Sequence, residues 1–270
     1  MLEYEKISET FSTLPPDKLD FESLVIEDNS VESHCWRAEV LKDLRKFQRL
    51  RIEDSSRTSA DDLARIIKDG YCLRELSLSY SQLTEDLLRV IARENVSLQT
   101  MRVEAHTDTK PLVKISDSAW ATLQTHSPNL NLVITCYLED DEDCEVVLAP
   151  PVTHLYLGGS PSSRIIRRVS ESCPRLVELV INSCSSGIID KELLMTARGC
   201  PELSAIGLGD CEVTCSALVQ FAKICKQRLQ ILYVWETSLI EDENFDIADA
   251  VSNVSSSLGR SWTPEYVPPW

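Results

Sequence analysis

The sequence is short of basic residues and has no long hydrophobic run. Its 270 residues include 27 Lys and Arg against 43 Asp and Glu, a formal net charge of −16. Nucleic acid and anionic membrane surfaces would repel such a chain, whereas a basic protein surface would attract it. No apolar run approaches the roughly 18 residues of a membrane-spanning helix. We therefore expect a protein partner, and neither a nucleic acid nor a membrane.

The N-terminus lacks a recognisable targeting segment. Its first residues, MLEYEK, have neither the basic start nor the apolar stretch of a secretory signal peptide. We therefore expect an intracellular protein, whose ten cysteines are reduced.

Catalytic and metal-binding patterns are also missing. The four histidines fall in different parts of the chain without paired spacing. Cys211 and Cys215 have no second pair to complete a zinc site. Gly207 and Gly209 lack the third glycine of a phosphate-binding loop, and instead leave room for something to approach closely. We predict no enzyme active site, no cofactor and no metal.

What the sequence does contain is a repeated pattern of leucine and cysteine. Residues 172–184, SCPRLVELVINSC, return 27 residues later as 199–211, GCPELSAIGLGDC. The spacing is that of the leucine-rich repeat core, L-x-x-L-x-L-x-x-N/C. Similar cores start at Phe21, Phe47, Leu73, Leu98, Leu130, Val152, Leu176, Leu203 and Leu229.

Each core predicts a short parallel strand, because apolar residues alternate along it, and a helix of period 3.6 follows. The predicted fold class is α/β: a leucine-rich-repeat solenoid of about nine repeats. We expect a curved array with the strands on the concave face and the helices outside. The predicted parts are an N-terminal segment (1–20), the array (21–240), a capping helix (241–257) and a tail (258–270).

Two surface features of the predicted array are an acidic run and an apolar stretch late on the strand face. The acidic run 139–145, EDDEDCE, reads as a solvated loop or as a docking patch for a basic partner. Along the strand face, outward positions are charged early in the array and become apolar late, at Ile231, Tyr233 and Trp235. Such aromatic residues often anchor interfaces. The alternative is that the chain's own tail covers them.

The tail has three prolines, two tryptophans and a tyrosine in 13 residues, which is unusual for a frayed end. Prolines reduce the entropy lost when such a segment docks. Burying an indole of about 150–250 Å² at about 25 cal/mol/Å² contributes several kcal/mol. The tail therefore either packs on its own array or inserts into a pocket of a partner.

These stretches resemble a known family. The repeat LSAIGLGDCEVTCSA at 203–217 and the tail LGRSWTPEYVPPW are similar to the cryptochrome-binding F-box and leucine-rich-repeat proteins of the animal circadian clock. The resemblance implies a non-catalytic substrate receptor of a Skp–cullin–F-box ubiquitin ligase, in cytoplasm and nucleus. It also implies that the array embraces cryptochrome and that the tail enters the flavin pocket. The implied partner-binding residues are Trp270, Pro269, Val267, Tyr266, Pro264, Trp262, Trp235 and Tyr233.

The sequence departs from this family at its start. The first 20 residues lack the leucine- and proline-rich helices of an F-box. We therefore expect the chain to bind substrate, while partnership with the Skp adaptor and cullin requires an F-box in the full-length product. The alternative function is a leucine-rich-repeat scaffold, or a protective binder without a ligase, whose tail packs on its own array.

Overall fold

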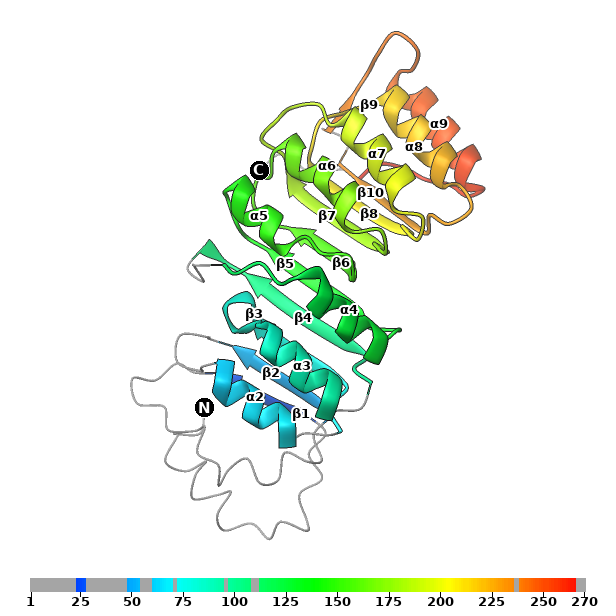
Figure 1. The fold of residues 1–270 in the computed structure, drawn as a ribbon. Coiled ribbons are helices and arrows are strands. Elements are labelled where there is room, and N and C mark those ends of the chain that lie inside the picture. Colours follow the sequence, from blue (N-terminus) through cyan, green and yellow to red (C-terminus); the bar gives the residue numbers. More distant parts are fainter. Residues whose placement is uncertain are drawn as a thin grey trace. The chain divides into compact units, whose positions relative to one another are not determined.

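The computed structural model describes residues 23–27, 48–53, 60–69, 72–94, 97–107, 112–235 and 238–265. It confirms the predicted leucine-rich-repeat solenoid, because parallel strands alternate with helices along the chain (Figure 1). The chain divides into two compact units: unit 1 is Met1–Glu104 with Thr109–Leu130, and unit 2 is Ala105–Asp108 with Asn131–Trp270. Within the described ranges, no helix combines the length and apolar character needed to cross a membrane.

Unit 1 is a parallel sheet with helices packed side by side. Its strands pair in chain order: β1 (Ser23–Glu27), β2 (Arg49–Glu53), β3 (Glu75–Ser79) and β4 (Thr100–Ala105). Its helices are α2 (Ala60–Asp69), the 3-10 turn η3 (Tyr80–Gln82), α3 (Glu85–Glu94) and α4 (Asp117–His126). Helix α3 packs between α2 and α4.

Unit 2 repeats this arrangement and carries the C-terminal elements. Its strands pair in the order β5 (Asn131–Cys136), β6 (Val152–Leu157), β7 (Glu178–Ser183), β8 (Ala205–Asp210) and β10 (Ile231–Val234), all parallel. Its helices α5 (Asp141–Val147), α6 (Ser163–Ser172), α7 (Asp190–Gly199), α8 (Cys215–Cys225) and α9 (Ile247–Leu258) pack in succession. Two short strands, β9 (Val213–Thr214) and β11 (Leu239–Ile240), pair separately.

The repeated leucines form the cores of both units. In the repeat that contains β8, Leu203, Ile206 and Leu208 are at most 1% exposed. Leu203 lies just before the strand, which begins at Ala205. The core starts Leu73, Leu98, Leu130, Leu176 and Leu229 likewise precede their strands, whereas Val152 is the first residue of β6. The predicted core starts at Phe21 and Phe47 lie outside the described residues.

Carboxylates at the start of a helix, or in the turn before it, bond to the start of a neighbouring helix. The linked pairs, with N···O distances, are Glu85 with Ser116 (3.2 Å), Asp141 with Ser162 (3.4 Å), Asp190 with Thr214 (2.9 Å) and Asp242 with Ser216 (2.7 Å). In each pair the carboxylate accepts a backbone N–H at or near a helix N-terminus, where the helix dipole favours negative charge. Some of the chain's acidic side chains therefore hold neighbouring repeats together through hydrogen bonds.

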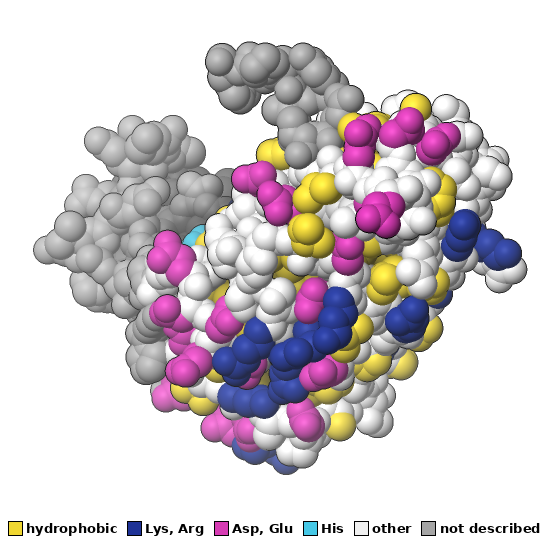
Figure 2. Space-filling view, turned by 90° about the horizontal axis from the view of Figure 1, so that it is seen from above, with side chains coloured by type: hydrophobic (Ala, Val, Ile, Leu, Met, Phe, Trp, Pro, Cys, Tyr) yellow, Lys and Arg dark blue, Asp and Glu magenta, His cyan; other side chains and the backbone are white. Residues whose placement is uncertain are grey.

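The acidic run 139–145 is mostly helix α5, so the prediction of a loop there was wrong. Acidic residues suit its first turn, and Cys144 and Val147 are buried beneath it. On α6, Arg164 and Arg168 lie 2.8 and 3.8 Å from the Glu145 carboxylate and offset part of its charge. Figure 2 shows several Lys and Arg side chains close together on this face, and others apart from them, although the net charge is −16.

The C-terminal helix starts later than the sequence indicated: α9 begins at Ile247, whereas the predicted capping helix began at 241. Asp242 forms a turn in between, because its carboxylate accepts hydrogen bonds from the backbone N–H groups of Asn244 and Phe245. Helix α9 packs against α8.

The Asp242 turn should make stability fall in acid. Hydrogen bonds, the largest effect coming from the Ser216 backbone N–H, lower the pKa of Asp242 from 3.8 to about 2. Because the folded-state pKa is depressed, this stabilisation is present above pH 3.8 and is lost as the pH falls through about 2. Denaturant unfolding between pH 5 and pH 2 should show a shallower fall in the free energy of unfolding for Asp242→Asn than for the parent. The exposed neighbour Glu243, changed to Gln, is the control and should keep the parent's slope.

Candidate functional site

One row of side chains crosses the strand face of unit 2. In register from β5 to β10 it runs through Thr135, Tyr156, Val180, Gly207 and Tyr233. Gly207 has no side chain, so nothing projects from the sheet between Val180 and Tyr233 in this row. The row therefore places two tyrosines on either side of a shallow floor.

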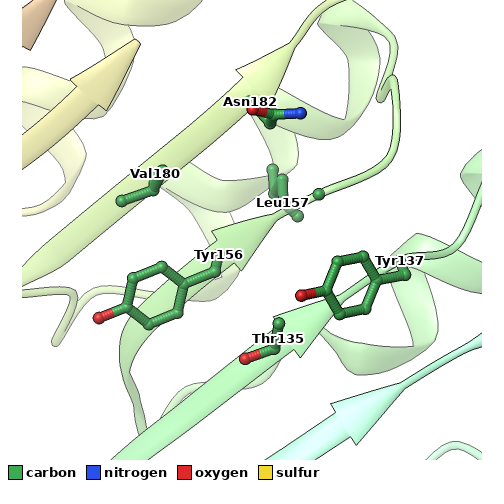
Figure 3. A pocket seen from close by; sticks show the side chains of 7 residues that line it. Thr135, Tyr137, Tyr156, Leu157, Val180 and Asn182 are labelled. Atoms are coloured by element: carbon green, nitrogen blue, oxygen red, sulfur yellow. The ribbon is translucent and has the colours of Figure 1, made fainter. Parts of the chain in front are cut away.

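At one end of this row lies a hollow of about 310 Å³, called here the tyrosine hollow. It is lined by Thr135, Tyr137, Tyr156, Leu157, Gly158, Val180 and Asn182 (Figure 3). None of these residues carries a formal charge at neutral pH. Its walls therefore suit an uncharged, aromatic or apolar group.

Tyr137 lines the hollow and is 46% exposed. Its ring stacks on His106, with centroids 4.8 Å apart and planes 12° from parallel. Gly158 lies beside it, and a Cβ there would lie 2.6 Å from the tyrosine ring, so a larger residue would displace the ring. Sequence reasoning missed this site, since Tyr137 and Gly158 meet only through the pairing of two strands.

A second feature, the β10 patch, consists of Ile231, Tyr233 and Trp235. The first two are 58% and 44% exposed, although both are large hydrophobic residues. Trp235 is half-buried, and its indole N–H donates to the Tyr233 hydroxyl at 3.4 Å. The patch lies at the positions where the sequence analysis predicted an apolar end of the strand face.

The first half of the tail, residues 259–265, is called the tail root and lies beside β10. Gly259 ends α9 in the left-handed conformation, with φ 66°, which turns the chain back toward the sheet. Arg260 donates to the carbonyl of Gln230. The Glu265 N–H donates to the Val234 carbonyl at 2.8 Å, and Glu265 pairs in parallel with Trp235.

Trp262 fastens the tail root to the unit. Its side chain is 7% exposed, and its indole N–H donates to the Leu232 carbonyl at 2.7 Å. Its backbone N–H and carbonyl both bond the Ser255 hydroxyl, at 3.0 and 3.1 Å. The ring is thus a buried anchor.

The predicted partner-binding residues therefore fall into three groups. Tyr233 and Trp235 lie on the strand face, and Pro264 is half-buried in the tail root. Trp262 was predicted to support partner contact, but its burial in its own chain leaves it to hold the tail instead. Tyr266, Val267, Pro269 and Trp270 lie outside the described residues.

Four buried cysteines of unit 2 have a raised pKa and are protonated at neutral pH. Burial raises the pKa of Cys200 and Cys215 to about 11, and that of Cys173 and Cys211 to about 12. At neutral pH such thiols are poor nucleophiles and metal ligands. Across the ranges that the structure describes, no three His, Cys, Asp or Glu residues are grouped so that they could hold a metal.

No family model matches the chain. Individual relatives do: the chain is 34% identical over 255 residues to F-box/LRR-repeat protein 21 of Ovis aries, covering 92% of this chain and 58% of the relative. The Mus musculus protein of the same name is 33% identical over the same shares. The chain belongs to the F-box/LRR-repeat protein family. It spans less than two thirds of the length of these relatives.

A solved structure supports the fold of this family member. The crystal structure of the TLR13–ssRNA13 complex matches 92% of this chain and 36% of that one, with a TM-score of 0.52 and 13% identity. At that identity the likeness concerns the solenoid fold alone.

Proposed function

We propose that the chain is the substrate-recognition part of a Skp–cullin–F-box ubiquitin ligase and that it binds cryptochrome. Membership of the F-box/LRR-repeat family supports the ligase connection, and the resemblance of the repeats and tail supports the substrate. The Skp adaptor and cullin would bind through an F-box of the full-length product. The receptor would work without catalysis of its own, in cytoplasm and nucleus, where the free thiols of the described residues suit a reducing environment.

One observation carries this proposal: an aromatic patch and a fastened tail root lie side by side. Glu265 pairs with Trp235, so residues 266–270 leave the described chain next to the β10 patch. A segment that starts from a fixed point loses less entropy on binding than a free one. We infer that Trp270 enters the flavin pocket of cryptochrome, together with Tyr266, Val267 and Pro269. Tyr233 and Trp235 would contact the protein around the pocket.

Replacing Trp270 with alanine should weaken cryptochrome binding by about 30-fold or more, which is the loss expected for an aromatic hot spot of about 2 kcal/mol. The melting temperature should stay within about 2 °C of the parent's, because the main contact of this residue in the proposal is with the partner. Binding would be measured by calorimetry, with thermal unfolding of each variant alongside. Added flavin should weaken the parent's binding by occupying the same pocket.

The matched control is Ile188→Ala, which removes an exposed apolar side chain (49% exposed) outside the strands of unit 2. Its affinity should equal the parent's. Equal affinity for Trp270→Ala and Ile188→Ala would exclude insertion of the tail.

A second candidate function is a scaffold or protective binder of another protein, with the tail packed on its own array. The burial of Trp262 and the pairing of Glu265 favour it, because half of the tail is already packed there. In that case cryptochrome would not bind, and Trp270→Ala would lower the melting temperature.

A further inference from the structure

We propose that, when no partner is bound, residues 266–270 bind to the tyrosine hollow of the same chain. This contact would hold Trp270 against the strand face of unit 2 and keep it from a partner's pocket. The inference needs no partner and does not rest on the proposed function. It rests on the chemistry of the hollow, on where the tail root ends, and on the length of the remaining segment.

The chemistry of the hollow matches the segment. Residues 266–270 read Tyr-Val-Pro-Pro-Trp and carry no charged side chain. The hollow is likewise lined by uncharged residues, with Tyr137 and Tyr156 as aromatic walls. Stacking or edge contact between an indole and these phenol rings is favourable, and no charged side chain has to be desolvated. A hollow of about 310 Å³ has room for one large aromatic side chain.

The tail root ends within reach of the hollow. Glu265 lies beside β10, and β8 and β7 follow in the sheet. Three strand spacings, about 14 Å in all, therefore separate the end of the tail root from β7. Five extended residues span about 17 Å, so the Trp270 backbone reaches the rim formed by Val180 and Asn182.

The path between these points is open. On β8 the segment would cross Gly207, which has no side chain, and Ala205, which is only 7% exposed. Large aromatic side chains stand at the two ends of the path, Tyr233 and Trp235 beside the tail root and Tyr156 in the hollow. The low floor of the strand face thus lies where the segment would pass.

A short tether makes even a weak contact effective. A segment held close to its site has an effective concentration of about 1 mM or more. A contact with a dissociation constant of about 1 mM would therefore be occupied about half of the time. Any partner whose pocket takes Trp270 would first have to displace it, and variants that empty the hollow should bind such a partner more tightly.

The full chain with 5-fluorotryptophan tests this contact by fluorine NMR, without a partner. The five tryptophans give separate resonances, and Trp270→Phe assigns one of them. A soluble nitroxide then reports how exposed each indole is. In the parent, Trp270 should show about half or less of the relaxation enhancement that it shows when the hollow is altered, as expected for a site occupied half of the time or more. Tyr137→Ala removes one wall, and Asn182→Arg blocks the rim.

Both altered side chains are exposed, so these variants should fold like the parent. Ile188→Ala, an exposed position outside the hollow, is the control and should leave the Trp270 resonance unchanged. Equal exposure of Trp270 in the parent and both hollow variants would overturn the proposal. Protection that grows with protein concentration would also overturn it, because the occupant would then be the tail of a second copy.

Discussion

Replacing Trp262 with alanine should lower the free energy of unfolding by about 3–5 kcal/mol, the usual cost of removing a buried aromatic ring. The side chain is 7% exposed, and its indole N–H is a hydrogen-bond donor to the Leu232 carbonyl at 2.7 Å. The change would leave a cavity between α9 and the sheet and would free the tail root from β10. Denaturant unfolding followed by circular dichroism measures the loss.

The Trp262→Phe variant distinguishes the contribution of the ring to stability from that of its hydrogen bond. It keeps most of the apolar volume but loses the N–H donor and part of the ring system, so it should cost about 1–3 kcal/mol, less than Trp262→Ala. Nearby, Ser261→Ala is a control, because that residue is exposed. If Trp262→Ala unfolded like Ser261→Ala, the ring could not be the anchor described above. Binding that depends on the tail should weaken with Trp262→Ala even though the ring is buried in its own unit.

The repeat fold was predictable because single apolar residues recur at fixed positions in each repeat. Leu203, Ile206 and Leu208 alternate with outward residues and are buried as the pattern requires. The acidic run 139–145 was mispredicted because its composition suggests full solvation. Whether such a run becomes a helix depends on what its few apolar residues contact, and Cys144 and Val147 are buried.

The candidate site was predictable only in part, for a similar reason. The β10 patch follows from alternation within one strand. The tyrosine hollow depends on the register between β5 and β6, which brings Gly158 next to Tyr137. The composition of the tail left open whether it contacts its own array or a partner, and the family resemblance implied a partner contact for Trp262. The structure shows that its own unit covers this residue.

Two glycines on β8 allow a sharp test of the strand packing. A Cβ added at Gly209 would lie 2.2 Å from the Asn182 carbonyl oxygen on β7, so the backbone would have to move. The close approach for which the sequence left room is therefore that of the neighbouring strand. The Gly209 carbonyl also accepts hydrogen bonds from the Ser238 hydroxyl and the Cys211 N–H, at 2.6 and 2.9 Å. Moving this strand would disturb all of these contacts.

Gly209→Ala should therefore lower the free energy of unfolding by about 3 kcal/mol, at the upper end of the usual cost of overpacking. Gly207→Ala is the matched control, two residues earlier in the same strand. Its added Cβ would lie 3.5 Å from the Val180 methyl groups, an ordinary contact, so the loss should stay below about 1 kcal/mol. Denaturant unfolding of both variants gives the comparison. Equal stability of the two would mean that β7 and β8 are farther apart at Gly209 than the structure has them, since only backbone overlap distinguishes the two positions.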